Sequence, residues 1–324
     1  MDRRSPSGRG VRSRALTSIL TVRHTTVYRY AQPVGLGEHR MMFRPRASHD
    51  IRLLGTSLTI SPRPAHLRWL HDPFDNSVAV ATFEGTTTNL TFASTVTLEH
   101  FEYSPPEYPL EVYARRYPFK YSDEDFPNLE RGLARRYGSE AVSTWALQFL
   151  DPASDTPTVQ VLRAMTHGIG QFRYVRRVEK GVQPPELTLA TRQGSCRDFA
   201  VLMMEAARAL GIAVRFVSGY IFGPERAGSA TPVGAGAGGS APIAGGGATH
   251  AWVQAYLPGA GWVDFDPTNN IIGNRNLIRV AVAWSPEQVL PLWGTYIGNA
   301  GDFIAMDVEV QVSLQPPASD STAR

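Results

Sequence analysis

The chain has 324 residues, of which 43% are hydrophobic and 19% charged, a composition that excludes a mainly disordered protein. The length exceeds the roughly 100–200 residues of one typical domain, and no run of about 18 apolar residues suggests a membrane-spanning helix. The net charge of +3 lies in residues 1–20, where five arginines stand against one aspartate. The remainder is close to neutral and lacks the broad basic surface of a nucleic-acid-binding protein.

The two ends of the chain are expected to be disordered tails over residues 1–20 and 315–324. The apolar stretch Ala15–Leu20 is shorter than the core of about 7–15 residues that a signal peptide needs. We therefore expect a cytoplasmic protein that does not associate with membranes.

From residue 21 to residue 105 the sequence is typical of strands. Segments 78–83 and 90–98 are rich in β-branched and aromatic residues, and Gly85 and the Pro62–Pro64 stretch separate such segments. Apolar residues do not recur at helical spacing. The pattern predicts an N-terminal β-sandwich-like domain.

Helical spacing begins after Pro105 and Pro106. Apolar residues recur every three or four positions in two segments, which predicts two helices: Phe126, Leu129, Leu133 and Tyr137, then Val142, Trp145, Ala146 and Phe149. Thr156 and Pro157 resemble the start of a third helix. Residues 158–285 then read as helix, loop, helix and several strands. The fold class is predicted to be α+β, with a second unit over residues 106–314.

Residues 224–248 interrupt that unit with eight glycines, seven alanines and three prolines. Such a stretch buries too little apolar surface to offset the entropy cost of ordering, so we expect a flexible loop. The loop ends two residues before His250, so its C-terminal end should lie beside the site, and it is either an inert insertion or a lid.

Cys196 is the single cysteine, which excludes intrachain disulfides and multi-cysteine metal sites. The simplest interpretation of a single cysteine is a small buried apolar residue. The sequence that follows nevertheless predicts an amphipathic helix, with Ser195 and Asp198 capping its start and Gly211 its end. In the first turn of this helix the dipole favours a thiolate, and the Cys196 N–H is available to an oxyanion.

A catalytic thiolate needs a base, and the base needs an orienting group. Residues 249–257 and 262–267 read as two strands joined by a turn. A three-residue loop puts Leu257 opposite Gly261, and Asp266 then lies on the face of His250. A two-residue loop would move Asp266 to the other face. The first register favours Asp266 over Asp264 as the orienting carboxylate.

Four motifs carry a resemblance to a known family: Gly-Ser-Cys-Arg-Asp-Phe-Ala at 194–200, Ser-Gly-Tyr at 218–220, His-Ala-Trp-Val at 250–253 and Gly-Trp-Val-x-Phe-Asp-Pro-Thr at 261–268. Together they resemble the bacterial transglutaminase-like proteins. Segments 28–34 and 39–46 resemble the region that precedes the catalytic domain in that family. The resemblance covers most of residues 22–285. It implies a papain-like catalytic core, with the cysteine helix packed on an antiparallel sheet, within residues 106–314.

The resemblance also implies a Cys-His-Asp triad, which corresponds to Cys196, His250 and Asp266. Tyr174 is a candidate second oxyanion donor, with an ordinary core tyrosine as the alternative. No calcium-ligand pattern is evident, because the acidic run 122–125 is interpreted as a solvated helix start. No cofactor or metal is expected.

The predicted reaction is thiol-dependent acyl transfer from a glutamine carboxamide or amide bond, through a thioester, to an amine or water. The expected partner is a protein or peptide that carries such a group, with an amine as acceptor. Two other functions remain open: a cysteine protease or amidase of the same fold, and a non-catalytic interaction scaffold. A metal site of His250, Asp264 and Asp266 is a third alternative.

Overall fold

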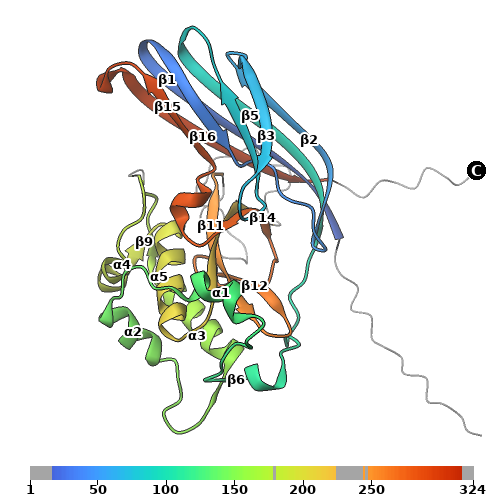
Figure 1. Cartoon of the computed structure of the whole chain (residues 1–324), viewed down its shortest axis with the longest axis vertical. Coiled ribbons are helices and arrows are strands. Elements are labelled where there is room, and N and C mark those ends of the chain that lie inside the picture. Colours follow the sequence, from blue (N-terminus) through green and yellow to red (C-terminus); the bar gives the residue numbers. More distant parts are fainter. Residues whose placement is uncertain (1–16, 178–179, 224–243, 245–246, 316–324) are drawn as a thin grey trace, which may run out of the picture.

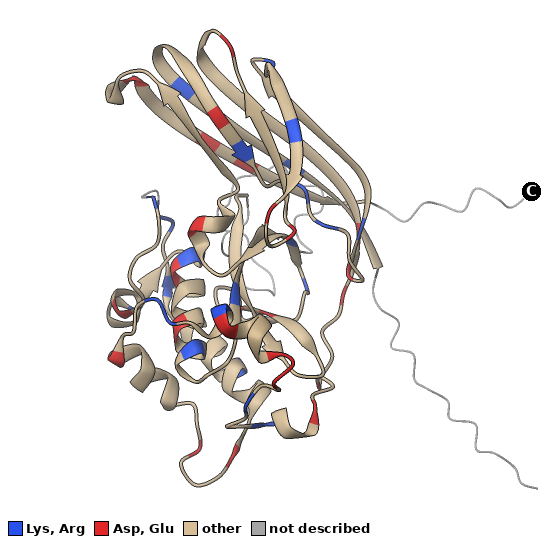
Figure 2. Cartoon of the chain, viewed as in Figure 1, with Lys and Arg blue, Asp and Glu red and all other residues tan. Residues whose placement is uncertain are grey.

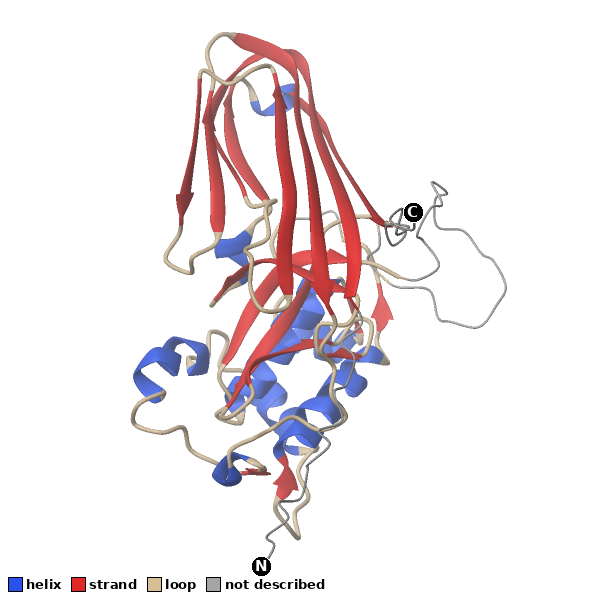
Figure 3. Cartoon of the chain, turned by 90° about the vertical axis from the view of Figure 1, so that its right-hand side faces the viewer, coloured by secondary structure: helices blue, strands red, loops and turns tan. Residues whose placement is uncertain are grey.

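A computed structural model describes residues 17–177, 180–223, 244 and 247–315 (Figure 1). Most of the predicted loop 224–248 and of the two predicted tails lies outside the described residues. The long strands of one unit gather at one end of the molecule, and the α-helices lie at the other (Figure 3). Basic and acidic residues are interspersed over both parts (Figure 2). No helix in the described part of the chain is long and apolar enough to cross a membrane.

The N-terminal unit is a seven-stranded sheet with antiparallel pairing. The central strand is β1, which pairs on one side with β5 and β4 and on the other with β16 and β15, while β2 and β3 extend the sheet beyond β5 and β4. The strands are β1 (Thr17–Met41), β2 (Ile51–Ser61), β3 (His66–His71), β4 (Ser77–Thr82), β5 (Thr86–Phe101), β15 (Leu292–Ile297) and β16 (Phe303–Leu314).

This sheet folds back over itself. On a straight strand that rises about 3.3 Å per residue, Tyr28 and His39 would lie more than about 30 Å apart. Their ring centroids are 6.4 Å apart, and His39 also lies 5.6 Å from Phe92. The register of β1 against β5 shifts between Arg29 and Val34, where the strand bends. The two halves enclose an apolar core between them, so the predicted sandwich-like unit is formed by one bent sheet.

Three predicted boundaries are wrong at their edges. Strands β15 and β16 belong to the N-terminal sheet, although residues up to 314 are predicted to belong to the second unit. Residues 17–20, predicted to be part of a tail, pair with β5, and Gln315 donates a backbone hydrogen bond to Ile19. The C-terminal boundaries differ because β1 offers a second hydrogen-bonding edge, whose neighbours come from the far end of the chain. The N-terminal boundary differs because β5 extends far enough to pair with residues 17–20.

The second unit confirms the α+β prediction. Helices pack against a five-stranded antiparallel sheet of order β13-β12-β11-β10-β14, and the cysteine-bearing helix α5 lies against β10 and β11. The strands are β10 (Val214–Ile221), β11 (His250–Leu257), β12 (Gly261–Asp266), β13 (Ile271–Ile272) and β14 (Leu277–Ala283). The helices are α1 (Phe126–Leu133), α2 (Glu140–Leu147), α3 (Thr158–Gly170), α4 (Pro185–Thr191) and α5 (Cys196–Ala209).

Short elements account for the remaining differences from prediction. Residues Thr156–Pro157, expected to begin a helix, form strand β7 against β6 (Arg116–Tyr117), and α3 begins one residue later. Helix α4 was not predicted. Strands β8 (Arg173–Tyr174) and β9 (Gln193–Gly194) form a parallel pair that precedes α5. Single turns of 3-10 helix occur at Val112–Ala114, Pro286–Val289 and Ala300–Asp302.

The two units contact each other through apolar and polar side chains. Leu20, Val22 and Leu98 pack in one buried cluster with Tyr220 and Ile278 of the second sheet. Polar contacts surround this cluster: His24 Nδ1 lies 2.9 Å from the Tyr220 hydroxyl, Asn76 exchanges two hydrogen bonds of 2.8 Å with the backbone of Val282, and Arg279 forms an ion pair of 3.0 Å with Asp50. The N-terminal unit thus directly supports strands β10 and β14.

Candidate active site

Cys196 occupies the first position of helix α5, as predicted from the cap and periodicity. The Asp198 carboxylate accepts hydrogen bonds of 2.8 Å from both the backbone N–H and the hydroxyl of Ser195, which fixes the residue that precedes the cysteine. Helix α5 ends before Gly211, whose φ of 73° suits a glycine. The first backbone N–H groups of a helix lack intrahelical acceptors, so the Cys196 N–H is available to a ligand.

Asp198 does more than cap the helix. Its other carboxylate oxygen accepts from the Arg177 guanidinium at 2.7 Å and from the Gln183 backbone N–H at 2.8 Å, and the side chain is fully buried. The Gln183 side chain in turn donates to the Gln193 carbonyl at 2.7 Å. The segment before α4 is therefore bound to the start of the cysteine helix, a link that the sequence alone does not indicate because it joins distant polar residues.

The hairpin β11–β12 has the predicted three-residue-loop register. Leu257 pairs with Gly261 and Val253 with Phe265, so Asp266 falls opposite Trp252. His250, at the start of β11, and Asp266, at the end of β12, meet diagonally: Nε2 of His250 lies 2.8 Å from Oδ2 of Asp266. Both side chains are completely buried. The register prediction is confirmed.

The second ring nitrogen of His250 is the one available to the thiol. Nδ1 is buried and has no hydrogen-bond partner among the described residues, while the Cys196 side chain interacts with the ring. Burial alone would lower the pKa of His250, but the Asp266 carboxylate, followed by Cys196, raises it to about 10. The site thus favours an imidazolium beside Cys196.

A second diagonal pair lies next to the first. Nε1 of Trp252 donates to Oδ1 of Asp264 at 2.7 Å, and the Trp252 ring stacks on His250 with centroids 5.8 Å apart at an angle of 25°. Burial raises the pKa of Asp264. Asp264 therefore orients Trp252 rather than His250. Within the described residues, no group of three His, Cys, Asp or Glu side chains could hold a metal ion.

Asn269 joins the site without having been predicted. Its Nδ2 atom donates to Oδ2 of Asp266 at 2.9 Å and lies 3.4 Å from Nε2 of His250. Its Oδ1 atom accepts from the backbone N–H of Ala244 at 2.8 Å. The backbone N–H of Thr268 donates to Oδ1 of Asp266 at 2.9 Å. The turn after β12 therefore holds the carboxylate, and its sequence, Pro-Thr-Asn-Asn, gave only a turn signal.

Tyr174 lies near Cys196, on strand β8. The parallel pairing of β8 with β9 places Tyr174 opposite Gly194, two residues before the cysteine. Burial, followed by the neighbouring Cys196, raises the pKa of Tyr174 to about 12, so its hydroxyl stays protonated at neutral pH. A protonated hydroxyl can donate a hydrogen bond to an oxyanion.

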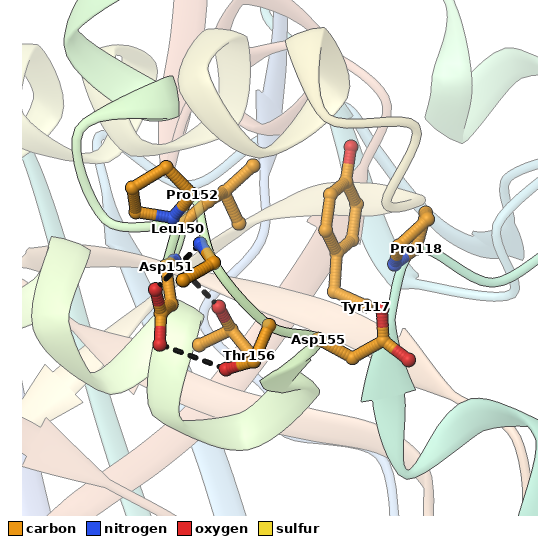
Figure 4. A pocket seen from close by; sticks show the side chains of 9 residues that line it. Tyr117, Pro118, Leu150, Asp151, Pro152, Asp155 and Thr156 are labelled. Atoms are coloured by element: carbon orange, nitrogen blue, oxygen red, sulfur yellow. Dashed lines mark hydrogen bonds between the residues drawn. The ribbon is translucent and has the colours of Figure 1, made fainter.

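A separate cavity of about 310 Å³ lies between β6 and the loop after α2 (Figure 4). Asp151, which lines it, already accepts hydrogen bonds of 2.8 Å from the Ala153 backbone and the Ser154 hydroxyl. None of Cys196, His250, Asp266 and Tyr174 lines this cavity.

Two family models match the chain. Residues 20–99 match the bacterial transglutaminase-like N-terminal region. Residues 147–267, which include Cys196, His250 and Asp266, match the transglutaminase-like superfamily. The two matches coincide with most of the bent sheet and with the greater part of the second unit.

Relatives and solved structures agree with these matches. An uncharacterised protein of Mycobacterium tuberculosis is 29% identical over 319 residues, which cover 93% of each chain. An uncharacterised protein of Mycobacterium leprae is 35% identical over 122 residues, 38% of this chain and 37% of that protein. The crystal structure of a candidate cysteine protease from Cytophaga hutchinsonii aligns with a TM-score of 0.63 at 17% identity, over 93% of this chain and 99% of that chain. This last similarity shows a shared fold.

Proposed function

The chain belongs to the transglutaminase-like superfamily, a family of thiol-dependent enzymes, and on this premise we propose that Cys196, His250 and Asp266 catalyse acyl transfer from a glutamine carboxamide. One observation carries the proposal. Asp266 occupies Nε2 of His250 at 2.8 Å, which leaves Nδ1 to exchange a proton with Cys196 and the reactants.

In the first step the Cys196 thiolate attacks the carboxamide carbon and a carbon–sulfur bond forms. The oxyanion accepts a hydrogen bond from the Cys196 N–H, with Tyr174 as the second donor. Nδ1 of protonated His250 gives its proton to the leaving nitrogen, the carbon–nitrogen bond breaks, and ammonia departs. The products are a thioester and a neutral imidazole.

In the second step an amine or water attacks the thioester. Nδ1 of His250 takes the proton of the acceptor, the carbon–sulfur bond breaks, and the thiolate and imidazolium are restored. Asp266 keeps the ring in the orientation that presents Nδ1 throughout. An amine acceptor gives a substituted amide, and water gives a glutamate side chain.

Mass spectrometry of a glutamine peptide, incubated with the protein in the presence and absence of a primary amine, tests the proposal. Addition of the amine with loss of ammonia is the expected result. Conversion of the amide to the acid in both samples identifies a hydrolase with the same first step. Peptide fragments would instead support the cysteine protease alternative, and an unchanged peptide across a panel of donors would contradict the proposal.

The matched variant is Cys196→Ala. It removes the nucleophile but changes little volume, so we expect loss of all turnover at an unchanged melting temperature. Labelling of the native protein by iodoacetamide at neutral pH, absent in the variant, provides a second readout. Full release of ammonia by Cys196→Ala would overturn the mechanism, and absence of labelling in the native protein would favour the interaction-scaffold alternative.

A further inference from the structure

A groove of about 940 Å³ runs between helix α3 and the segment that contains β13. One wall is the exposed face of α3 formed by Gln160, Arg163 and His167, which lie three and four residues apart. The opposite wall is formed by residues 270–272, 275 and 276, and residues 104–106 line the same groove. The two walls approach each other where Nδ2 of Asn270 lies 3.4 Å from Nδ1 of His167.

The groove adjoins the candidate active site. Ile271, which lines it, pairs with Asp266, and Asn270 directly follows Asn269, which contacts Asp266 and His250. At the end of α3, a Cβ added at Gly170 would lie 3.3 Å from the carbonyl oxygen of Pro267 and 3.8 Å from Cβ of Asn270. One end of the groove thus meets the turn that holds the orienting carboxylate.

The lining of the groove is cationic and rich in hydrogen-bond donors. Its positive charge comes from Arg163 and Arg275, which line it together with His167 and three side-chain amides, and no aspartate or glutamate lines it. Arg275 is 3.6 Å from Glu102, which partly neutralises it. Arg163 is exposed and forms no ion pair with any residue that the structure describes. A carboxylate in the groove would therefore meet uncompensated positive charge at Arg163.

We propose that this groove binds an acidic segment of the substrate and so selects reactive glutamines with aspartate or glutamate nearby. This inference rests on the proposed function, whose substrate class it narrows. Arg163 is seven residues before Gly170 on α3, about 10 Å at a rise of 1.5 Å per residue. An extended peptide covers that length in about three residues. Gly170 adjoins the turn that holds Asp266, on the Nε2 side of His250, whereas Cys196 lies beyond the imidazole ring. The path to the thiol therefore needs about two further extended residues, and the acidic residues that bind should lie about five to seven positions from the glutamine.

Steady-state kinetics with matched peptides test the inference. One peptide carries two aspartates at these positions, its partner carries asparagines there, and both versions are made on either side of the glutamine. We expect kcat/KM to be about two- to five-fold higher for the acidic peptide on one side, the upper part of the range for one exposed ion pair. The preference should shrink as salt is raised, because salt screens exposed charges.

Two substitutions assign the effect to the groove. Arg163→Gln should remove most of the acidic preference and leave kcat/KM for the neutral peptide unchanged. Glu102→Gln should increase the preference, because it releases Arg275. The control is Arg131→Gln, which removes an exposed arginine at the end of α1, outside the groove, and should change neither peptide.

Equal kcat/KM for acidic and neutral peptides would overturn the inference while leaving the proposed function intact. An equal loss for both peptides in Arg163→Gln would also overturn it. If no glutamine peptide reacts, the proposed function fails, and binding of fluorescent acidic and neutral peptides to Cys196→Ala tests the groove independently. Tighter binding of the acidic peptide, reduced by Arg163→Gln, would support the groove, and equal binding would contradict it.

Discussion

His250 determines the chemistry of the candidate site at the scale of single residues, because its two nitrogens have different surroundings. Nε2 is held by Asp266, and Nδ1 has no partner among the described residues. The neighbouring acid, Asp264, binds Trp252 instead. Two carboxylates of the same strand, two residues apart, therefore act on two different rings.

Substitution of each acid separates these two arrangements. Asp266→Asn should lower turnover by orders of magnitude, since the imidazole loses the carboxylate that orients it and stabilises its charge. Asp264→Asn keeps a hydrogen-bond acceptor for Trp252 and should have a much smaller effect. Rates of ammonia release from a glutamine peptide measure both. Equal losses, or the reverse order, would contradict the assignment of Asp266.

The pH dependence of acylation provides a second test at this scale. The carboxylate of Asp266 and the Cys196 side chain outweigh the effect of burial and raise the pKa of His250 to about 10, so the imidazolium that we propose as proton donor to the leaving group persists well above neutral pH. Removal of the carboxylate destabilises the imidazolium, so in Asp266→Asn the alkaline limb of the profile should move to lower pH. The residual single-turnover rate measured against pH checks this, and an unmoved limb would show that another group sets it.

At the scale of elements, the site is formed where three adjacent structures come together: the start of α5, the hairpin β11–β12 and the strand β10. Gly219 in β10 lies opposite His250 in the sheet. A Cβ added there would come within 2.2 Å of the Ile278 carbonyl oxygen and 2.6 Å of Cη2 of Trp252. This glycine lets β14 and the Trp252 ring approach closely, which explains the physical role of the Ser-Gly-Tyr motif.

Gly219→Ala should therefore destabilise the fold by about 1–3 kcal/mol, as expected when a methyl group is forced into a packed core. It should also lower activity, since the displaced Trp252 ring stacks on His250. The matched control is Gly55→Ala in β2, where an added Cβ has no heavy atom within 4 Å. Chemical denaturation of both variants measures the difference, and similar stability of the two would contradict the close approach.

At the scale of the whole molecule, the bent sheet and the second unit form one structure, because the chain leaves the N-terminal sheet after β5 and returns to it in β15 and β16. The ion pair of Asp50 with Arg279 joins the two units. Burial would raise the pKa of Asp50, but Arg279, with Ser48, lowers it to about 2, below the usual value of 3.8.

The sign of this shift predicts acid sensitivity. A lowered pKa means that the carboxylate stabilises the folded protein above pH 4 and that the contribution disappears as the pH falls from about 4 through about 2. The contribution is about 2 kcal/mol. Asp50→Asn should be less stable than the native protein at neutral pH and should lose less stability below pH 4. Urea unfolding at several pH values measures this.

The control for this experiment is Asp307→Asn, which removes an exposed ion pair with Arg29 on the bent sheet. Exposed ion pairs contribute little to stability, so the free energy of unfolding of this variant should depend on pH as that of the native protein does. If the free energy of unfolding of Asp50→Asn also depends on pH as that of the native protein does, the ion pair between the units contributes nothing measurable to stability.

The sequence by itself determined the local features of this protein. Helix α5 follows from apolar spacing and caps, and a three-residue loop decides which face of the hairpin carries Asp266, so the cysteine position and the register could be predicted. These features depend on residues close together in the chain, where periodicity and turn length leave few alternatives.

Only the tertiary structure decided which distant segments meet. Strands β15 and β16 pair with β1, and the sheet bends so that the His39 and Phe92 rings come into contact. Asn269 donates a hydrogen bond to Asp266, and Arg177 forms an ion pair with Asp198. Exposed strands and polar side chains have many compatible partners in sequence, and nothing in their spacing ranks those partners. The choice is made by the packing of whole surfaces, which buries one combination and leaves the others in water.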